Sequence, residues 1–175
     1  MRILIESSTS YRGRNSRPNW LLLAASVGAA LTVGALGAVF SPRLSAASGR
    51  WYAMLAKPAW APPDRWFEPV WLVLYVLMGA AVWLIGRERY HRGRGVALVA
   101  YAIQLLLNAA WAPLFFGAKN IGAGLFVIVA LWLAVAWTIR EFAVVRAGAA
   151  WMLVPYWIWV SVASAVNFAI WKLNQ

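Results

Sequence analysis

The sequence predicts an all-α membrane protein, a bundle of five transmembrane helices. Hydrophobic residues make up 63% of the 175 residues and charged residues 12%, whereas soluble domains are about 45–50% apolar and about 25% charged. The mean hydropathy is +0.67. The apolar residues also gather in runs of about twenty, the length of helix that crosses a bilayer. The runs do not alternate polar and apolar residues, so they are not typical of a membrane β-barrel.

Five apolar runs define the expected spans, and each covers the hydrocarbon core at about 1.5 Å of rise per residue. They are residues 20–40, 67–86, 95–116, 122–139 and 149–171, the fourth being the shortest. None carries a charged residue at its middle, so no carboxylate pair or proton relay is expected inside the membrane. The spans form one domain, residues 20–175, which follows a basic tail, residues 1–19, that is expected to be disordered.

The net charge of +11 comes from sixteen Lys and Arg against five Asp and Glu. In a soluble protein such an excess indicates nucleic-acid binding. Here the cations lie outside the apolar runs, mostly in the connections between them, where they fit loops that face lipid headgroups, and no nucleic-acid partner is expected. Ten of the cations fall on the N-terminal side of the expected spans and six on the other side. The positive-inside rule therefore predicts a cytoplasmic N-terminus.

The residues that bind most metals in proteins are scarce. The chain has no cysteine and one histidine, His91, in a basic loop, so no thiolate or multi-histidine metal site is expected within one chain. A tetrapyrrole would more readily be held by stacking, with cations on its carboxylates, than by iron coordination. Arg50, Lys57 and Arg65 could supply those cations, and contact with lipid headgroups is the alternative role for them.

The segment between the first two spans, residues 41–66, is long for a bundle connection and rich in aromatic residues and proline. Trp51, Met54 and Leu55 share one face of an expected short interfacial helix. This helix ends before Pro58, because the residue before a proline disfavours helix, and a following pair of prolines keeps the backbone extended. The segment is either a headgroup anchor or a stiff cap over an opening in the bundle, and its stiffness favours the cap.

Three of the expected spans carry an aromatic stripe with small or amide residues among the rings. Residues in each stripe are three or four positions apart, so they lie on one side of a helix. The stripes are Trp71, Tyr75 and Met78; Tyr101, Gln104, Asn108 and Trp111; and Tyr156, Trp159, Ala163, Asn167, Ile170 and Asn174. The amides are expected to face the bundle interior, because unpaired polar groups are costly at bilayer depth. The stripes are typical of ordinary helix packing, and they also suit a pocket for a planar apolar ligand.

Four blocks of rare residues at fixed spacing follow one another along the chain. They are Trp51-Tyr52-x-x-Leu55-x-Lys57-Pro58-x-Trp60-x-Pro62-Pro63; Val70-Trp71-x-x-Leu74-Tyr75-x-x-Met78-Gly79; Gln104-Leu105-x-Leu107-Asn108-x-x-Trp111-x-Pro113-Leu114-Phe115-Phe116-Gly117; and Pro155-Tyr156-x-x-Trp159-x-x-x-Ala163-x-x-x-Asn167-x-x-Ile170. In these blocks, from about residue 20 to the C-terminus, the chain resembles the TspO/MBR family, the tryptophan-rich sensory proteins that include the mitochondrial translocator protein.

The resemblance implies five helices around a pocket that the first loop closes as a lid, often in a homodimer. It implies porphyrin ligands, protoporphyrin IX or haem, with no required cofactor. By motif position, the resemblance implies that the ligand is contacted by Trp71, Tyr75, Asn108, Trp111, Trp159 and Ala163. It also implies that the lid includes Lys57, Pro58 and Trp60. We add Gln104, Tyr156 and Asn167 from the same stripes, and Trp51 from the lid. No cation follows Tyr156 closely enough for a cholesterol-recognition motif, which favours porphyrin over sterol.

Three functions stay open. The leading one is a membrane receptor or regulator that binds porphyrins and transports or senses them. The second is a light-dependent porphyrin-degrading enzyme, with Trp159 as the candidate catalytic residue. The third is a small transporter of hydrophobic ligands, sterols included. Gly34 and Ala38, small residues one helical turn apart, favour a homodimer.

Overall fold

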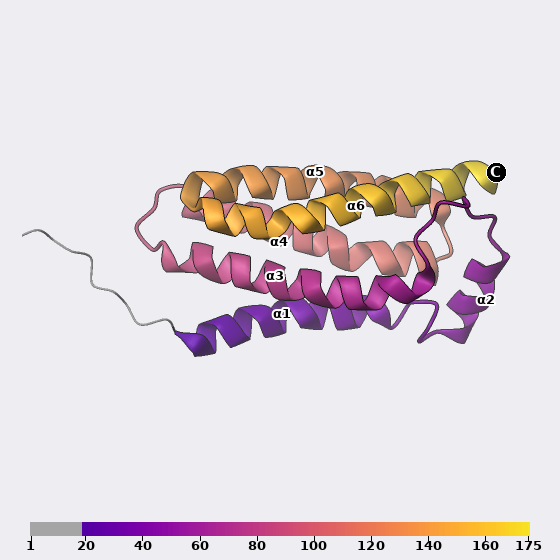
Figure 1. The fold of residues 1–175 in the computed structure, drawn as a ribbon, viewed down its shortest axis with the longest axis horizontal. Helices are drawn as coiled ribbons and strands as arrows, with labels where there is room; N and C mark the ends of the chain where they lie inside the picture. The colour runs from indigo at the N-terminus through magenta and orange to yellow at the C-terminus, as the bar shows by residue number, and fades with distance from the viewer. Residues whose placement is uncertain (1–18) are drawn as a thin grey trace, which may run out of the picture.

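The computed structural model describes residues 19–175, and they form a bundle of helices joined by loops (Figure 1). In chain order the elements are α1 (Trp20–Ala38), α2 (Ala46–Met54), the 3-10 turn η1 (Asp64–Trp66), α3 (Phe67–Arg87), α4 (Arg94–Ala112), the π-helical turn η2 (Pro113–Gly117), α5 (Ile121–Val145) and α6 (Ala147–Leu173). Within this part of the chain, five helices are long and apolar enough to cross a membrane, namely all but α2. The predicted fold class is confirmed: the protein is an integral, multi-pass helical bundle. The expected disordered tail lies outside the described residues, except for Asn19.

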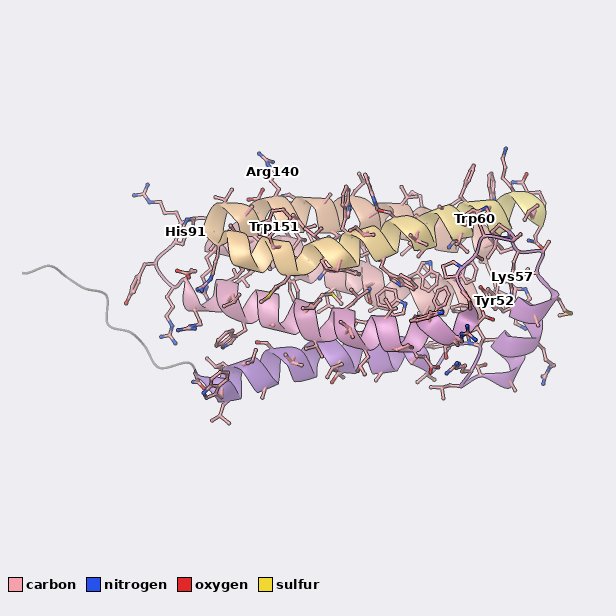
Figure 2. All side chains as sticks on the ribbon, in the orientation of Figure 1. Tyr52, Lys57, Trp60, His91, Arg140 and Trp151 are labelled. Atoms are coloured by element: carbon pink, nitrogen blue, oxygen red, sulfur yellow. The ribbon has the colours of Figure 1, made fainter. Side chains whose placement is uncertain are left out.

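The fourth span is longer than predicted. It was expected to end at Ile139 and to be the shortest, whereas α5 continues to Val145 and has 25 residues. Arg140 ends the apolar run in the sequence, but its side chain points out of the bundle (Figure 2), while Phe142 is fully buried. The helix continues because a charged residue on the outward face does not disturb packing of the inward face.

The spans form a closed ring in which each packs against the next, and α3 also contacts α4 across the ring. The order around the ring is α1, α3, α6, α5 and α4, and α4 returns to α1. α1 and α3 approach closely, because a Cβ on Gly79 would overlap the backbone of Val27. In Figure 1, α2 lies at the end of the bundle where α6 ends, opposite the loop between α3 and α4. We call this end the lid end, and residues 41–66 the lid.

The end of α4 is reshaped to meet the lid. Pro113 has no backbone N–H to continue the α-helical ladder, and the chain continues from it as a π-helical turn to Gly117. The wider turn places Phe115 and Phe116 in the interior, both buried. Lys119 then adopts a left-handed conformation, with φ of 54°, which turns the chain into α5. The two phenylalanine rings form the surface on which α2 rests.

The expected face of the lid helix is only partly turned inward. Of Trp51, Met54 and Leu55, which we predicted to share a face, Trp51 and Leu55 pack against the cluster around Tyr52 and Phe115, whereas Met54 is exposed. The buried residues of α2 are Ser48 and Tyr52. The Ser48 hydroxyl donates a hydrogen bond to the carbonyl of Phe116 at 3.3 Å. The Tyr52 ring packs edge-on against Phe116, with centroids 5.4 Å apart. The Ser48 hydroxyl and the Tyr52 ring therefore fit α2 to η2, beside the partly buried side chains of Trp51 and Leu55.

A second attachment joins the lid to the C-terminal end of α6. The backbone N–H of Ala56 donates to Asn174 Oδ1 at 3.0 Å, and Asn174 Nδ2 donates back to the Ala56 carbonyl at 2.9 Å. The same Nδ2 also donates to the carbonyl of Ile170 at 2.7 Å. One amide thus holds the lid backbone two residues before Pro58, and caps α6 at the same time.

Replacing Asn174 with alanine is expected to loosen the lid while leaving the spans folded. Two exposed hydrogen bonds are lost, each contributing about 0.5–1.5 kcal/mol, so hydrogen–deuterium exchange over residues 55–61 should accelerate about tenfold. Asn120→Ala is the matched control, because Asn120 lies at the same end and its side chain caps α5. Unchanged protection of the lid in Asn174→Ala would show that this amide does not hold it.

Candidate functional site

A cavity of about 750 Å³ lies inside the lid end of the bundle. Residues from all five spans and from the lid line it, and its volume falls within the range of small-molecule sites, about 300–1,000 Å³. Six of the residues singled out from the sequence lie in its wall: Lys57, Trp71, Tyr75, Asn108, Trp111 and Ala163. The structure therefore brings residues from the lid and from three spans to one space.

Asn108 is the polar centre of the wall. The Tyr75 hydroxyl donates to Asn108 Oδ1 at 2.6 Å, and Asn108 Nδ2 donates to the hydroxyl of Tyr156 at 2.9 Å. The three side chains come from α3, α4 and α6, so the amide joins three helices through two hydrogen bonds. Asn108 itself is buried at 7% exposure. Pairing of this kind satisfies polar groups that would otherwise be costly inside a membrane bundle.

Aromatic rings from separate elements surround this centre. Trp71 stacks on Tyr75 with centroids 5.5 Å apart, and meets Tyr156 edge-on at 6.0 Å. Trp111, which also lines the cavity, stacks on Phe115 with centroids 5.3 Å apart. Flat π-faces beside an amide offer both stacking and hydrogen bonding to a planar guest.

The remaining predicted contacts lie in the layer behind the wall. Tyr156 and Gln104 are buried, and Gln104 has no hydrogen-bond partner among residues 19–175. Asn167 lines a separate space of about 20 Å³ next to Tyr52 and Trp111. Trp159 packs edge-on against Phe67 at 5.4 Å, and Phe67 is part of the wall. The candidate catalytic indole is therefore one ring removed from the cavity.

The predicted lid residues occupy three different environments. Lys57 lines the cavity. Trp51 packs edge-on against Phe115 at 5.6 Å, and Pro58 begins a turn that the N–H of Ala61 closes by donating to its carbonyl at 3.0 Å. Trp60 is exposed at the lid end of the bundle (Figure 2). Lys57 alone of these four reaches the wall.

The sequence reasoning missed the contribution of α1 and of Tyr52. Gly34 and Ala38, whose spacing favours a dimer, line the cavity of the same chain, and a Cβ on Gly34 would overlap the ring of Tyr75. Small residues mark a close approach, and here the approach is within one chain. The homodimer therefore remains a prediction, and the spacing of Gly34 and Ala38 no longer supports it. Tyr52 stands in the first motif block, four residues after Ser48, a spacing that puts both on one face of a helix.

The charged residues of the wall are gathered at the lid end. Arg43, Lys57, Asp64 and Glu68 line the cavity, whereas Arg50 and Arg65, which we had considered for ligand carboxylates, lie outside the wall. Arg43 Nη1 is 2.6 Å from Glu68 Oε2, and Lys57 Nζ is 4.0 Å from Asp64 Oδ2. The cavity is thus ionic at the lid and largely apolar and aromatic farther in.

Five spans closed around a ligand-sized space, with an aromatic lid at one end, define a class of small polytopic membrane protein. Residues 26–172 match the family model described as the TspO/MBR family. The chain belongs to this family, as the four sequence blocks indicated.

Curated relatives are similar over most of their length. The tryptophan-rich protein TspO of Chlorobaculum tepidum is 41% identical over 155 residues, covering 88% of this chain and 96% of the relative. The protein CrtK of Rhodobacter capsulatus is 41% identical over 142 residues, covering 81% and 85%. The translocator protein of Sus scrofa is 38% identical over 161 residues, covering 90% and 93%. The similarity therefore includes both the spans and the lid.

Proposed function

We propose that the protein is a membrane receptor or regulator that binds porphyrins, protoporphyrin IX or haem, in the cavity under the lid, and so transports or senses tetrapyrroles. Membership of the TspO/MBR family supports the class of function. The observation that carries the ligand class is the wall itself, in which indole and phenol rings from separate elements converge on one amide. Such a wall suits a flat, largely apolar molecule with a few polar atoms.

In this proposal the side chains of the cavity wall hold the porphyrin ring by stacking and by one polar contact. Trp71, Tyr75 and Trp111 supply stacking faces, Asn108 supplies a polar contact, and Ala163 leaves room beside them. Behind the wall, Tyr156 contacts Trp71 and Asn108, and Trp159 contacts Phe67. Gln104 and Asn167 are further buried amides proposed for the site. His91 lies at the opposite end of the bundle (Figure 2), so binding does not depend on histidine coordination from this chain. The lid residues Trp51, Lys57, Pro58 and Trp60 are proposed to close over the guest.

Replacing Trp71 with alanine is expected to weaken protoporphyrin binding about tenfold, because a large buried aromatic contact contributes about 1.5–3 kcal/mol. The measurement is a titration of the purified protein in detergent, followed by quenching of intrinsic tryptophan fluorescence and by the Soret absorbance. Trp151→Ala is the matched control, since Trp151 is exposed far from the lid end (Figure 2). Equal affinity of the two variants would place the ligand elsewhere.

A further inference from the structure

The ionic part of the cavity wall is confined to one segment of the chain. Among the described lining residues, the charged ones are Arg43, Lys57, Asp64 and Glu68, and all lie in the lid or the first turn of α3. The rest of the wall is apolar, aromatic or neutral. A guest that fits both parts is amphipathic, with an apolar body in the bundle and a polar edge at the lid.

The four charges differ in how much water they retain. The side chain of Lys57 is 27% exposed, whereas that of its nearest acid, Asp64, is 66% exposed. Arg43 and Glu68 are equally exposed, at 52% and 51%, and are paired at 2.6 Å. The Lys57 ammonium is therefore the least hydrated charge at the cavity mouth, and it biases the mouth towards anions.

The ammonium of Lys57 is held in place but retains donors for a ligand. Its Nζ lies 3.8 Å from the centroid of the Tyr52 ring. Its 4.0 Å separation from Asp64 Oδ2 is too long for a hydrogen bond, and Lys57 makes no hydrogen bond to another residue in 19–175. The ring quadrupole attracts a cation over its face, and an ammonium has three N–H donors, so the donors that point away from the ring remain available to a ligand.

Tyr52 is suited to this positioning role. Its ring is buried against Phe116 and Phe115, with centroids 5.4 and 6.4 Å away. Burial, and to a lesser extent the negative charge of Asp64, raise the pKa of Tyr52 to about 12. The phenol therefore stays neutral at physiological pH and presents a π-face instead of a competing oxyanion.

Asp64 and Lys57 differ in how easily each can move when an anion enters the mouth of the cavity. Asp64 can turn towards water at little cost, because exposed ion pairs contribute only about 0–1 kcal/mol. Lys57 cannot follow it without leaving the ring that it covers. Exchange of Asp64 for a ligand carboxylate is therefore the favoured rearrangement at the mouth.

We propose that Lys57, positioned by the ring of Tyr52, binds a carboxylate of the cavity's ligand. The cavity thereby selects amphipathic molecules with an anionic edge and holds that edge at the lid. This inference rests on the proposed function, and it adds the charge of the ligand and the direction in which the ligand lies. A guest with the same planar body but without carboxylates binds more weakly.

The test compares protoporphyrin IX with its dimethyl ester, which has the same ring and no carboxylate charge. The protein in detergent should bind the free acid about tenfold more tightly than the ester, the effect of one charge-assisted hydrogen bond. Lys57→Met should lose this preference, and Lys57→Arg should keep most of it. Tyr52→Phe retains the ring face and should keep the preference, whereas Tyr52→Leu should reduce it.

Arg65→Met is the matched control, because Arg65 is a lid cation outside the cavity wall. Equal binding of acid and ester by the unaltered protein overturns the inference and leaves porphyrin binding standing. The inference is also overturned if the Lys57→Met variant still binds the free acid more tightly than the ester. Failure of the unaltered protein to bind either compound instead overturns the proposed function. Thermal unfolding of each variant, followed by intrinsic fluorescence, separates lost binding from lost folding.

Discussion

Replacing Asn108 with leucine is expected to destabilise the bundle by about 2–3 kcal/mol and to weaken porphyrin binding. Leucine has a similar size but removes both hydrogen bonds that join α3, α4 and α6. Each such bond contributes about 0.6–2 kcal/mol in a membrane bundle, and the hydroxyl of the fully buried Tyr156 is left without its partner. The measurements are thermal unfolding in detergent and a protoporphyrin titration.

Gln104→Leu is the control for this prediction. Gln104 is an equally buried amide one helical turn away on α4, but neither of its side-chain polar atoms has a hydrogen-bond partner within residues 19–175. Removing an unpaired buried amide is expected to leave stability unchanged or to raise it. Adding Tyr75→Phe and Tyr156→Phe to Asn108→Leu should recover part of the loss, because no hydroxyl then remains unpaired. Equal destabilisation by both leucine variants would contradict the role assigned to the network.

Replacing Gly79 with alanine is expected to lower the midpoint of thermal unfolding by about 5 °C. Alanine is the better helix former by about 1 kcal/mol, so propensity alone predicts the opposite sign. The new Cβ would, however, overlap the backbone of Val27 on α1. A backbone atom cannot move aside as the end of a side chain can, so α1 and α3 must separate, and overpacking of this kind costs about 1–3 kcal/mol.

Gly86→Ala is the matched variant on the same helix. A Cβ at Gly86 meets no atom within 4 Å, so there alanine should act through helix propensity and raise the midpoint slightly. The two alanine substitutions are therefore expected to have opposite signs. If Gly79→Ala is also stabilising, the close contact of α1 with α3 is not present in the folded protein in detergent.

Much of the fold could be predicted from the sequence because the bilayer restricts it. A helix is the only form in which an isolated apolar run of about twenty residues can satisfy its backbone in lipid. The spans were therefore visible as runs, and the stripes at spacings of three and four correctly placed Trp71, Asn108 and Trp111 towards the interior. The fourth span was cut short because hydropathy marks the end of an apolar run, which is not the end of a helix.

The sequence by itself determined the five spans, the interior faces of three of them and the family. Only the tertiary structure decided which lid residues face inward, which cations border the cavity, and what α1 contributes to it. Helical periodicity relates residues within one element, whereas these choices depend on contacts between elements far apart in the chain, such as Ser48 with Phe116 and Ala56 with Asn174. Arg43 and Arg50 look alike as lid cations in the sequence, and the path of the chain around α2 alone brings Arg43 to the cavity wall.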